Sequence, residues 1–287
     1  MKPVLQIRGL HVDLHCGKQK SKRLVDDVEL QVCPGECLGI LGESGSGKSM
    51  TVKAILGLLD RQFTVTGEAT FKGRNLLKES KEDLRSIRGK EIAMVLQNPM
   101  TCFDPLYRIG NQMAETFAVH TSWGKAEIRK RSLEILERMN IRQGEEVLQK
   151  YPHQLSGGML QRIMIGIALA MEPALLVADE PTTAIDAITQ HEIMREFQRI
   201  KREFQTAMIF ITHDLGAISL VADQVLVMNQ GRVVDQGDFH HIIAHAKDPY
   251  TKLLVEKRHA VMVKYESVLQ GIFPEGCGQK GGRKNYA

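Results

Sequence analysis

The chain has 287 residues, of which 43% are hydrophobic and 25% are charged, as in an ordinary globular protein. Its 38 basic and 34 acidic residues leave a net charge of +4 without a basic stripe of interleaved aromatics, so we expect no nucleic-acid partner. Five scattered cysteines without a C-x-x-C pair, and no apolar run near the ~20 residues of a membrane helix, predict a cytoplasmic chain that meets membranes only through partners.

The first predicted elements surround a glycine-rich stretch. Residues 4–14 alternate in places and predict an edge strand, which a polar, basic loop at 18–23 follows. Residues 28–32 alternate with period two and predict another strand. The apolar run 37–41 predicts a buried strand, and residues 50–56 predict the helix that follows the glycine-rich stretch.

Three short elements come next. Residues 67–71 predict a strand, and residues 81–88 predict a charged helix. Ser80 and Asp83 have the spacing of a capping box at the start of that helix. The apolar run 92–96 predicts another buried strand.

From residue 109 to residue 171 the pattern is helical, without a convincing strand. Ile128, Ile135, Leu136 and Met139 share one helical face, while Lys, Arg and Glu side chains cover the other. We therefore interpret residues 98–171 as a helical subdomain inserted into an α/β chain.

The α/β alternation resumes after the helical block. Residues 175–178 and 207–211 predict strands separated by a helix over 189–204, and residues 225–234 predict a hairpin. Strands that alternate with helices predict a mainly parallel sheet, with its ligand at the carboxyl ends of the strands. We expect one domain over residues 1–255. An extension over residues 256–287 follows it, and its Gly/Lys-rich end at 276–287 predicts disorder.

The glycine-rich stretch matches the phosphate-loop pattern G-x-x-x-x-G-K-[ST]. Its glycines let backbone N–H groups turn inward around phosphate oxygens. Lys48 would reach the β- and γ-phosphates, and the Ser49 hydroxyl would ligate Mg²⁺. The predicted fold class is α/β, a P-loop NTPase core with a mainly parallel sheet, an antiparallel N-terminal β portion and the inserted helical subdomain. The predicted nucleotide-binding residues of the loop are Gly42, Glu43, Ser44, Gly45, Ser46, Gly47, Lys48, Ser49 and Met50.

A second anion cradle opens the helix that begins near residue 159. Ser156, Gly157 and Gly158 offer free N–H groups and a hydroxyl donor there. With this LSGGQ-like signature and the phosphate loop in order, the chain resembles the ATP-binding subunits of ABC transporters. The resemblance covers about residues 4–255 and implies an ATPase that uses ATP and Mg²⁺.

Polar side chains follow three of the predicted strands. Asp179 and Glu180 end one strand, where a hard cation takes oxygen ligands and an attacking water needs a base. The resemblance implies that Asp179, Ser49 and Gln97 hold Mg²⁺, that Glu180 polarises the water and that His213 bonds the γ-phosphate. It also makes Gln97 a relay to the membrane partner. Taken alone, the acidic pair could cap a helix, Gln97 could be a turn residue and His213 could be structural.

The resemblance also implies partners. A head-to-tail dimer would clamp each ATP between Lys48 of one subunit and the Ser156 and Gly158 of the other, with residues 184–186 coupling the two sites. The expected second ATPase is a paralogue. Two transmembrane permease subunits would hold the pair at the cytoplasmic face of the inner membrane, and an extracytoplasmic substrate-binding protein would act indirectly.

One segment departs from the family pattern. The family places an aromatic ring near the end of the first strand, where it stacks on adenine. Here that segment contains His11, Leu14 and His15 but no aromatic ring of Phe, Tyr or Trp. We expect Leu14 or His15 to substitute.

Two further segments indicate a branch. Residues 97–106 and 248–254 resemble the dipeptide, oligopeptide and nickel importers. Many peptide-type members of that branch continue into a cysteine-rich tail, sometimes with an iron–sulfur cluster. Here only Cys277 follows Cys102, so no Cys₄ site can form. The short tail therefore resembles the nickel and metal-chelate members, and this resemblance implies such a cargo. A non-transport ABC ATPase would need a long coiled-coil insertion or a second cassette, and a small-molecule kinase has no use for residues 155–158.

A histidine group near the end allows two interpretations. His241 and His245 are spaced i, i+4, with His240 beside them, as in a metal site. Without a nearby cysteine or carboxylate cluster, a solvated helix is the simpler interpretation.

Overall fold

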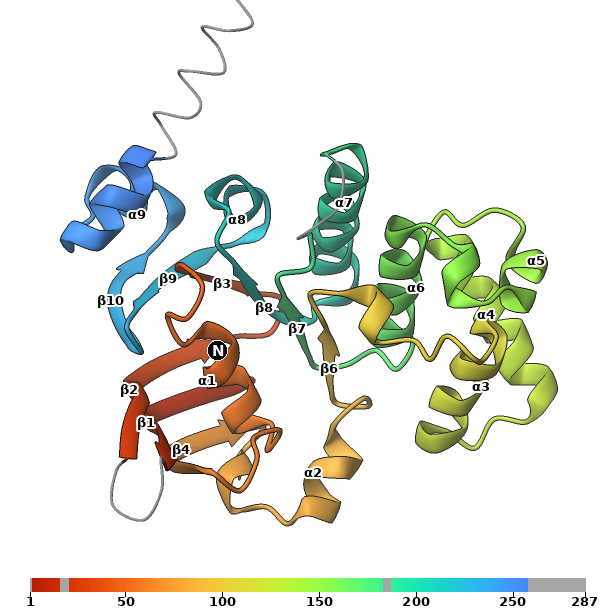
Figure 1. The fold of residues 1–287 in the computed structure, drawn as a ribbon, viewed down its shortest axis with the longest axis horizontal. Helices are drawn as coiled ribbons and strands as arrows, with labels where there is room; N and C mark the ends of the chain where they lie inside the picture. Colours follow the sequence, from red (N-terminus) through yellow and green to blue (C-terminus); the bar gives the residue numbers. More distant parts are fainter. Residues whose placement is uncertain (1, 16–20, 183–186, 258–287) are drawn as a thin grey trace, which may run out of the picture.

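The computed structural model describes residues 2–15, 21–182 and 187–257. The expected coupling loop at 184–186 and the Gly/Lys-rich end at 276–287 lie outside these residues. Two β-sheets and a lobe of helices make up the described part (Figure 1). The predicted fold class is confirmed, because an antiparallel N-terminal sheet accompanies a mainly parallel sheet and a helical insertion.

The antiparallel sheet is built from the N-terminal part of the chain. Its strand order is β2-β1-β4-β5. The strands are β1 (Leu5–His15), β2 (Ser21–Val32), β4 (Phe63–Phe71) and β5 (Arg74–Asn75). The prediction of β1 as an edge strand is wrong, since β1 pairs with β2 on one side and with β4 on the other. The predicted basic loop is also too long, because β2 already begins at Ser21.

The mainly parallel sheet has the strand order β10-β9-β3-β8-β7-β6. Its strands are β3 (Cys37–Leu41), β6 (Ile92–Val95), β7 (Leu175–Asp179), β8 (Ala207–Thr212), β9 (Gln224–Asn229) and β10 (Arg232–Gly237). The pairs β3–β8, β3–β9, β6–β7 and β7–β8 are parallel, while β9 and β10 form the predicted hairpin. Every residue of β3, β7 and β8 is buried, as expected of strands that are covered on both faces.

Helices cover both faces of this sheet. Helix α1 (Lys48–Ile55) lies between the two sheets, because its Val52 and Ile55 share one apolar cluster with Leu5 of β1 and Val177 of β7. The opposite face packs against α7 (Ala187–Phe204) and α8 (Leu215–Val221) in a second apolar cluster. The carboxyl ends of β3, β7 and β8 therefore remain the edge at which ligands can bind.

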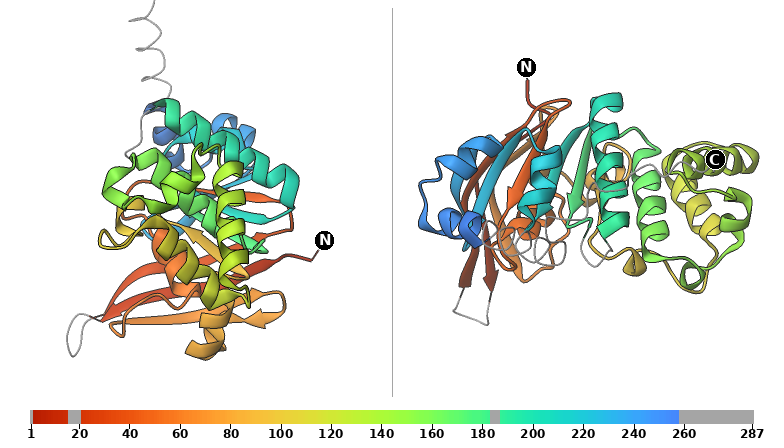
Figure 2. Two further views of the ribbon diagram at one scale, coloured as in Figure 1. Left: turned by 90° about the vertical axis from the view of Figure 1, so that its right-hand side faces the viewer. Right: turned by 90° about the horizontal axis from the view of Figure 1, so that it is seen from above.

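The helical insertion forms a separate lobe at one end of the molecule (Figure 2). It contains α3 (Ile109–His120), α4 (Lys125–Arg138), α5 (Gly144–Gln149) and α6 (Gly157–Leu169). Its predicted apolar face is confirmed, since Ile128, Ile135, Leu136 and Met139 are buried. In the ranges that the structure describes, no helix is long and apolar enough to span a membrane.

The shorter elements complete the chain. They are α2 (Lys81–Ile87), α9 (Phe239–Ala244) and the 3₁₀ turns Leu76–Lys78, Pro99–Thr101 and Pro152–Gln154. Half of the predicted capping box forms at α2, where the Ser80 hydroxyl accepts from the Asp83 N–H at 3.1 Å. Residues 249–257 are helical and pack with α9 against β9, in a cluster that includes Leu41 at the end of β3.

Candidate active site

The phosphate loop connects the end of β3 to the start of α1. Gly47 caps α1 with φ of 104°, and Gly45 has φ of 83°, conformations that L side chains rarely adopt. Gly42 is constrained by space instead, because a Cβ there would lie 2.4 Å from the Met228 carbonyl oxygen and 2.6 Å from Ser46 Oγ. Glycine is therefore required at these positions for geometric reasons.

Lys48 is the first residue of α1, and its side chain folds back over the loop. Only 4% of the residue is exposed. Its Nζ donates to the carbonyl oxygens of Gly42 at 2.8 Å and Glu43 at 2.9 Å. Burial lowers the pKa of Lys48, while the nearby carboxylates of Glu180 and Asp179 act in the opposite direction. The ammonium group is thus held at the loop by carbonyls and by negative charge.

Ser49 and Asp179 meet at the end of β7. Ser49 Oγ donates to Asp179 Oδ1 at 2.7 Å. Burial raises the pKa of Asp179, and the hydrogen bond from Ser49 opposes this shift. A hydroxyl and a carboxylate oxygen side by side are the hard donors that Mg²⁺ prefers, so this pair fits the expected cation.

Glu180 lies at the centre of a second polar group. Its backbone has φ of 47°, in the left-handed region, and its N–H donates to the Ile211 carbonyl at 2.8 Å. Gln97 Nε2 donates to Glu180 Oε2 at 3.0 Å, and His213 Nδ1 lies 3.5 Å from Oε1. The structure therefore brings the three predicted residues Gln97, Glu180 and His213 together.

Gln97 and Glu180 border a pocket of about 410 Å³ at the loop. It is lined by Leu24, Ser44, Gly45, Gly47, Lys48, Ser49, Met50, Gln97 and Glu180. Gln97 shares the pocket with Ser49, and its amide nitrogen bonds Glu180, so the amide oxygen is the atom that would meet Mg²⁺.

Sequence reasoning missed Leu24, an apolar residue that lines this pocket together with Met50. Neither Leu14 nor His15 is among the described residues that line it, and His15 Nε2 instead lies 2.7 Å from Thr64 Oγ1 on β4. The only sequence signal for Leu24 is an apolar residue directly after the polar run Ser21–Arg23.

The Ser-Gly-Gly turn lies in the helical lobe, away from the phosphate loop (Figure 1). Ser156 caps α6, and its side chain accepts from the Met159 N–H at 3.2 Å. Ser156 and Gly157 are exposed, and a Cβ on Gly157 would meet nothing within 4 Å. None of the described residues that line the loop pocket comes from 156–158, so one chain does not bring the two cradles together.

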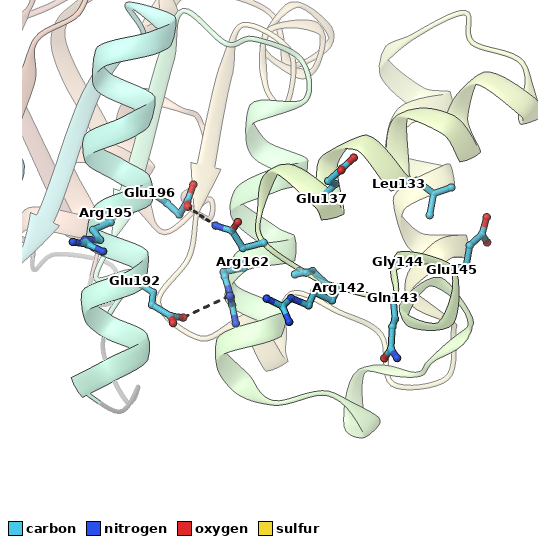
Figure 3. Close-up of a pocket in the computed structure, with 12 residues that line it drawn as sticks. Leu133, Glu137, Arg142, Gln143, Gly144, Glu145, Arg162, Glu192, Arg195 and Glu196 are labelled. Carbon is cyan, nitrogen blue, oxygen red and sulfur yellow. Dashed lines mark hydrogen bonds and ion pairs between the residues drawn. The ribbon is translucent and has the colours of Figure 1, made fainter.

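A larger pocket of about 930 Å³ lies between α7 and the helical lobe (Figure 3). Two polar contacts lie within its lining: Arg162 is 3.6 Å from Glu192, and Asn140 Nδ2 donates to Glu196 Oε1 at 3.3 Å. Because no residue of the phosphate loop lines this pocket, we do not assign the nucleotide to it.

The histidine group lies at α9. The ring of His245 has centroid distances of 6.0 Å to His240 and 5.9 Å to His241. Across the described ranges, no group of three or more His, Cys, Asp or Glu residues is arranged to hold a metal ion. The structure therefore gives no support to a metal site there.

Comparison with known proteins adds independent observations. Residues 25–183 match a family model described as ABC transporter. The metal-staphylopine import system ATP-binding protein CntD of Staphylococcus aureus is 45% identical over 248 residues, covering 86% of this chain and 92% of that protein. The dipeptide transport ATP-binding protein DppD of Lactococcus lactis is 42% identical over 262 residues, covering 90% of this chain and 74% of that protein.

A solved structure shows similarity at the level of the fold. It is the dimeric, post-hydrolysis state of the ATP-binding cassette MJ0796 bound to ADP and Pi. It aligns with a TM-score of 0.73 at 26% identity, covering 82% of this chain and 98% of that chain.

Proposed function

Since this chain belongs to the ABC transporter family and is the ATPase subunit of an ABC importer, we propose how its side chains bind and hydrolyse ATP and which cargo the importer carries. The observation that carries the proposal is the convergence of Lys48, Ser49, Gln97, Asp179 and Glu180 at the carboxyl edge of the central sheet.

In this proposal, the phosphate loop and Lys48 bind the phosphates of ATP. The loop N–H groups and the N-terminus of α1 attract the phosphate oxygens, and Lys48 Nζ contacts the β- and γ-phosphates. Ser49 Oγ, Asp179 Oδ1 and the amide oxygen of Gln97 would hold Mg²⁺, which would neutralise phosphate charge. The pocket wall at Leu24 receives the apolar part of the nucleotide.

Hydrolysis then depends on Glu180 as the general base. A water beside its carboxylate would lose a proton to it during attack on the γ-phosphate. Gln97 orients that carboxylate through the 3.0 Å hydrogen bond, and His213 lies on its other oxygen. His213, with 55% of its side chain exposed, is free to reach toward the γ-phosphate.

A complete site requires a second ATPase subunit. Support comes from the exposure of Ser156 and Gly157 and from their separation from the loop pocket, together with the dimeric state of the similar solved cassette. We propose a head-to-tail pair in which Ser156, Gly157 and Gly158 of one subunit close over the ATP held by the loop of the other. ATP binding closes the pair, and hydrolysis opens it.

The surface beside Gln97 is the proposed contact with the two transmembrane permease subunits, which would place the chain at the cytoplasmic face of the membrane. Leu96, Met100, Leu106 and Tyr107 are exposed there, Leu106 to 78%. Leu96 and Tyr107 also line a cavity of about 680 Å³ between β6 and the helical lobe. Gln97 lies beside this surface and bonds Glu180, so it can relay permease movements to the base.

For cargo, we propose a metal chelate, with nickel among the metals carried. The relative named for metal-staphylopine import matches over nearly its whole length at 45% identity. The second candidate is a dipeptide or oligopeptide, since the dipeptide relative is 42% identical.

Reconstitution with the membrane subunits that copurify with this chain tests the cargo. ATP hydrolysis in proteoliposomes would be measured with nickel alone, a nickel–opine chelate or dipeptides, each with the cognate binding protein. Stimulation by the chelate alone supports the proposal. Stimulation by dipeptides alone would replace it with the second candidate.

A further inference from the structure

The helical segment 249–257 makes a direct contact with the phosphate loop. Tyr250, the second residue of this segment, accepts a hydrogen bond on its hydroxyl oxygen from the Glu43 N–H at 2.7 Å. The two residues are separated by 207 positions in the sequence. Glu43 is the second residue of the loop, so the contact is made to the loop that is proposed to bind the phosphates.

The peptide unit that Tyr250 holds is also held by Lys48. The Glu43 N–H and the Gly42 carbonyl belong to one planar, trans peptide group, so their directions are tied together. Tyr250 engages the N–H, and Lys48 Nζ donates to the Gly42 carbonyl at 2.8 Å on the other side. A rotation of this peptide would break both bonds and displace the ammonium group of Lys48.

Tyr250 is itself firmly placed. Asp248 Oδ1 accepts from the Tyr250 N–H at 2.8 Å, and Asp235 Oδ2 on β10 accepts from the Asp248 N–H at 3.0 Å. The Tyr250 ring and Leu254 pack into the apolar cluster that contains Leu41, the residue directly before the loop. Burial raises the pKa of Tyr250, so its hydroxyl stays neutral across the physiological range.

A second contact also joins the segment 249–257 to Glu43, but it is exposed to solvent. Lys257 Nζ lies 3.3 Å from Glu43 Oε1, but both side chains are more than half exposed. An exposed ion pair of this kind contributes little. The hydrogen bond from the Glu43 N–H to Tyr250 is therefore expected to hold the loop more strongly than the Lys257–Glu43 ion pair does.

We propose that Tyr250 is a positioning residue for ATP binding, which fixes the Gly42–Glu43 peptide and thereby keeps Lys48 placed for the phosphates. The inference rests on the proposed role of the loop in nucleotide binding. It assigns the 249–257 segment a part in that site in addition to its packing role.

The test is titration of the purified full-length chain with ATP and Mg²⁺, combined with thermal melting. Tyr250→Phe keeps the ring and removes the hydroxyl, so ATP should bind about three- to tenfold more weakly, as expected for one lost hydrogen bond. Lys257→Ala removes the exposed ion pair and should leave the Kd within about twofold of wild type. Leu254→Ala weakens the packing of the segment and should lower the Tm while changing the Kd less than Tyr250→Phe does.

Two outcomes would overturn the inference. One is a Kd for Tyr250→Phe within about twofold of wild type. The other is that Tyr250→Phe and Leu254→Ala lose ATP affinity in proportion to the drop in their Tm. Such a proportion would mean that Tyr250 only packs the segment and does not position the loop. Lys48→Ala in the same titration tests the proposed loop site independently of Tyr250. If Lys48→Ala binds ATP as tightly as wild type, the proposal that the loop binds the phosphates is wrong.

Discussion

Glu180→Gln isolates the proton-accepting role of one carboxylate. The carboxamide has nearly the same shape and can still accept the hydrogen bond from Gln97, which is 3.0 Å long in the wild-type protein. What the variant loses is a base for the attacking water, an effect of about 10²- to 10⁴-fold in rate. That range equals about 2.7–5.5 kcal/mol of transition-state stabilisation.

ATP binding should survive the same change. Glu180 is one of the negative charges near Lys48, so its neutralisation removes a repulsion of the incoming phosphates. The expected result is a kcat lower by about two to four orders of magnitude with a Kd for ATP equal to or tighter than wild type. Phosphate release by the assembled importer measures kcat, and titration of the purified chain measures Kd.

Glu172→Gln is the matched control for this variant. Glu172 is exposed and has φ of 49°, close to the 47° of Glu180, so the same substitution is made on the same type of backbone away from the site. It should hydrolyse ATP at the wild-type rate. Near-normal turnover by Glu180→Gln would refute the assignment of Glu180 as the base.

Two other substitutions test the geometry of the loop and the cation site. Burial raises the pKa of Asp179 above 3.8, so the folded protein loses stability as the pH rises from about 4 through the raised pKa and this carboxyl ionises. Asp179→Asn avoids that cost, so its Tm should exceed that of wild type at neutral pH and should no longer do so below about pH 4, while Mg²⁺-dependent hydrolysis is abolished. A Tm equal to wild type at neutral pH would contradict the burial argument. Gly42→Ala places a Cβ 2.4 Å from the Met228 carbonyl and should lower the free energy of unfolding by about 1–3 kcal/mol in urea. Gly124→Ala, whose Cβ would meet nothing within 4 Å, loses only the glycine N-cap of α4 and should cost less than Gly42→Ala.

Local patterns predicted the parts of the site that are continuous in the chain. The phosphate loop with its strand and helix follows from the spacing of Gly42, Gly47 and Lys48. The strands β6, β7 and β8, which lead to Gln97, Asp179 and His213, follow from their apolar runs. The convergence of these side chains could be expected because parallel strands present their carboxyl ends at one edge.

Contacts between distant segments were not predictable in the same way. The alternation of β1 is the same whether one neighbour or two flank it, so its central place depends on the distant strand β4. Leu24 reaches the pocket because β2 passes beside the loop, and the Leu24 carbonyl would lie 2.3 Å from a Cβ on Gly231. Tyr250 likewise meets Glu43 only through the packing of the last described helical segment on β9.

The central claim is that an ATP held by Lys48 is completed by Ser156 of another subunit, and Ser156→Arg tests it most directly. Ser80→Arg is the control, since Ser80 also caps a helix and both variants lose a cap. The purified Ser156→Arg chain should bind ATP like wild type. An importer assembled with Ser156→Arg should hydrolyse ATP more than about tenfold more slowly, whereas one assembled with Ser80→Arg should keep the wild-type rate. Wild-type hydrolysis by Ser156→Arg, or a loss of ATP binding by the isolated chain, would contradict the composite site.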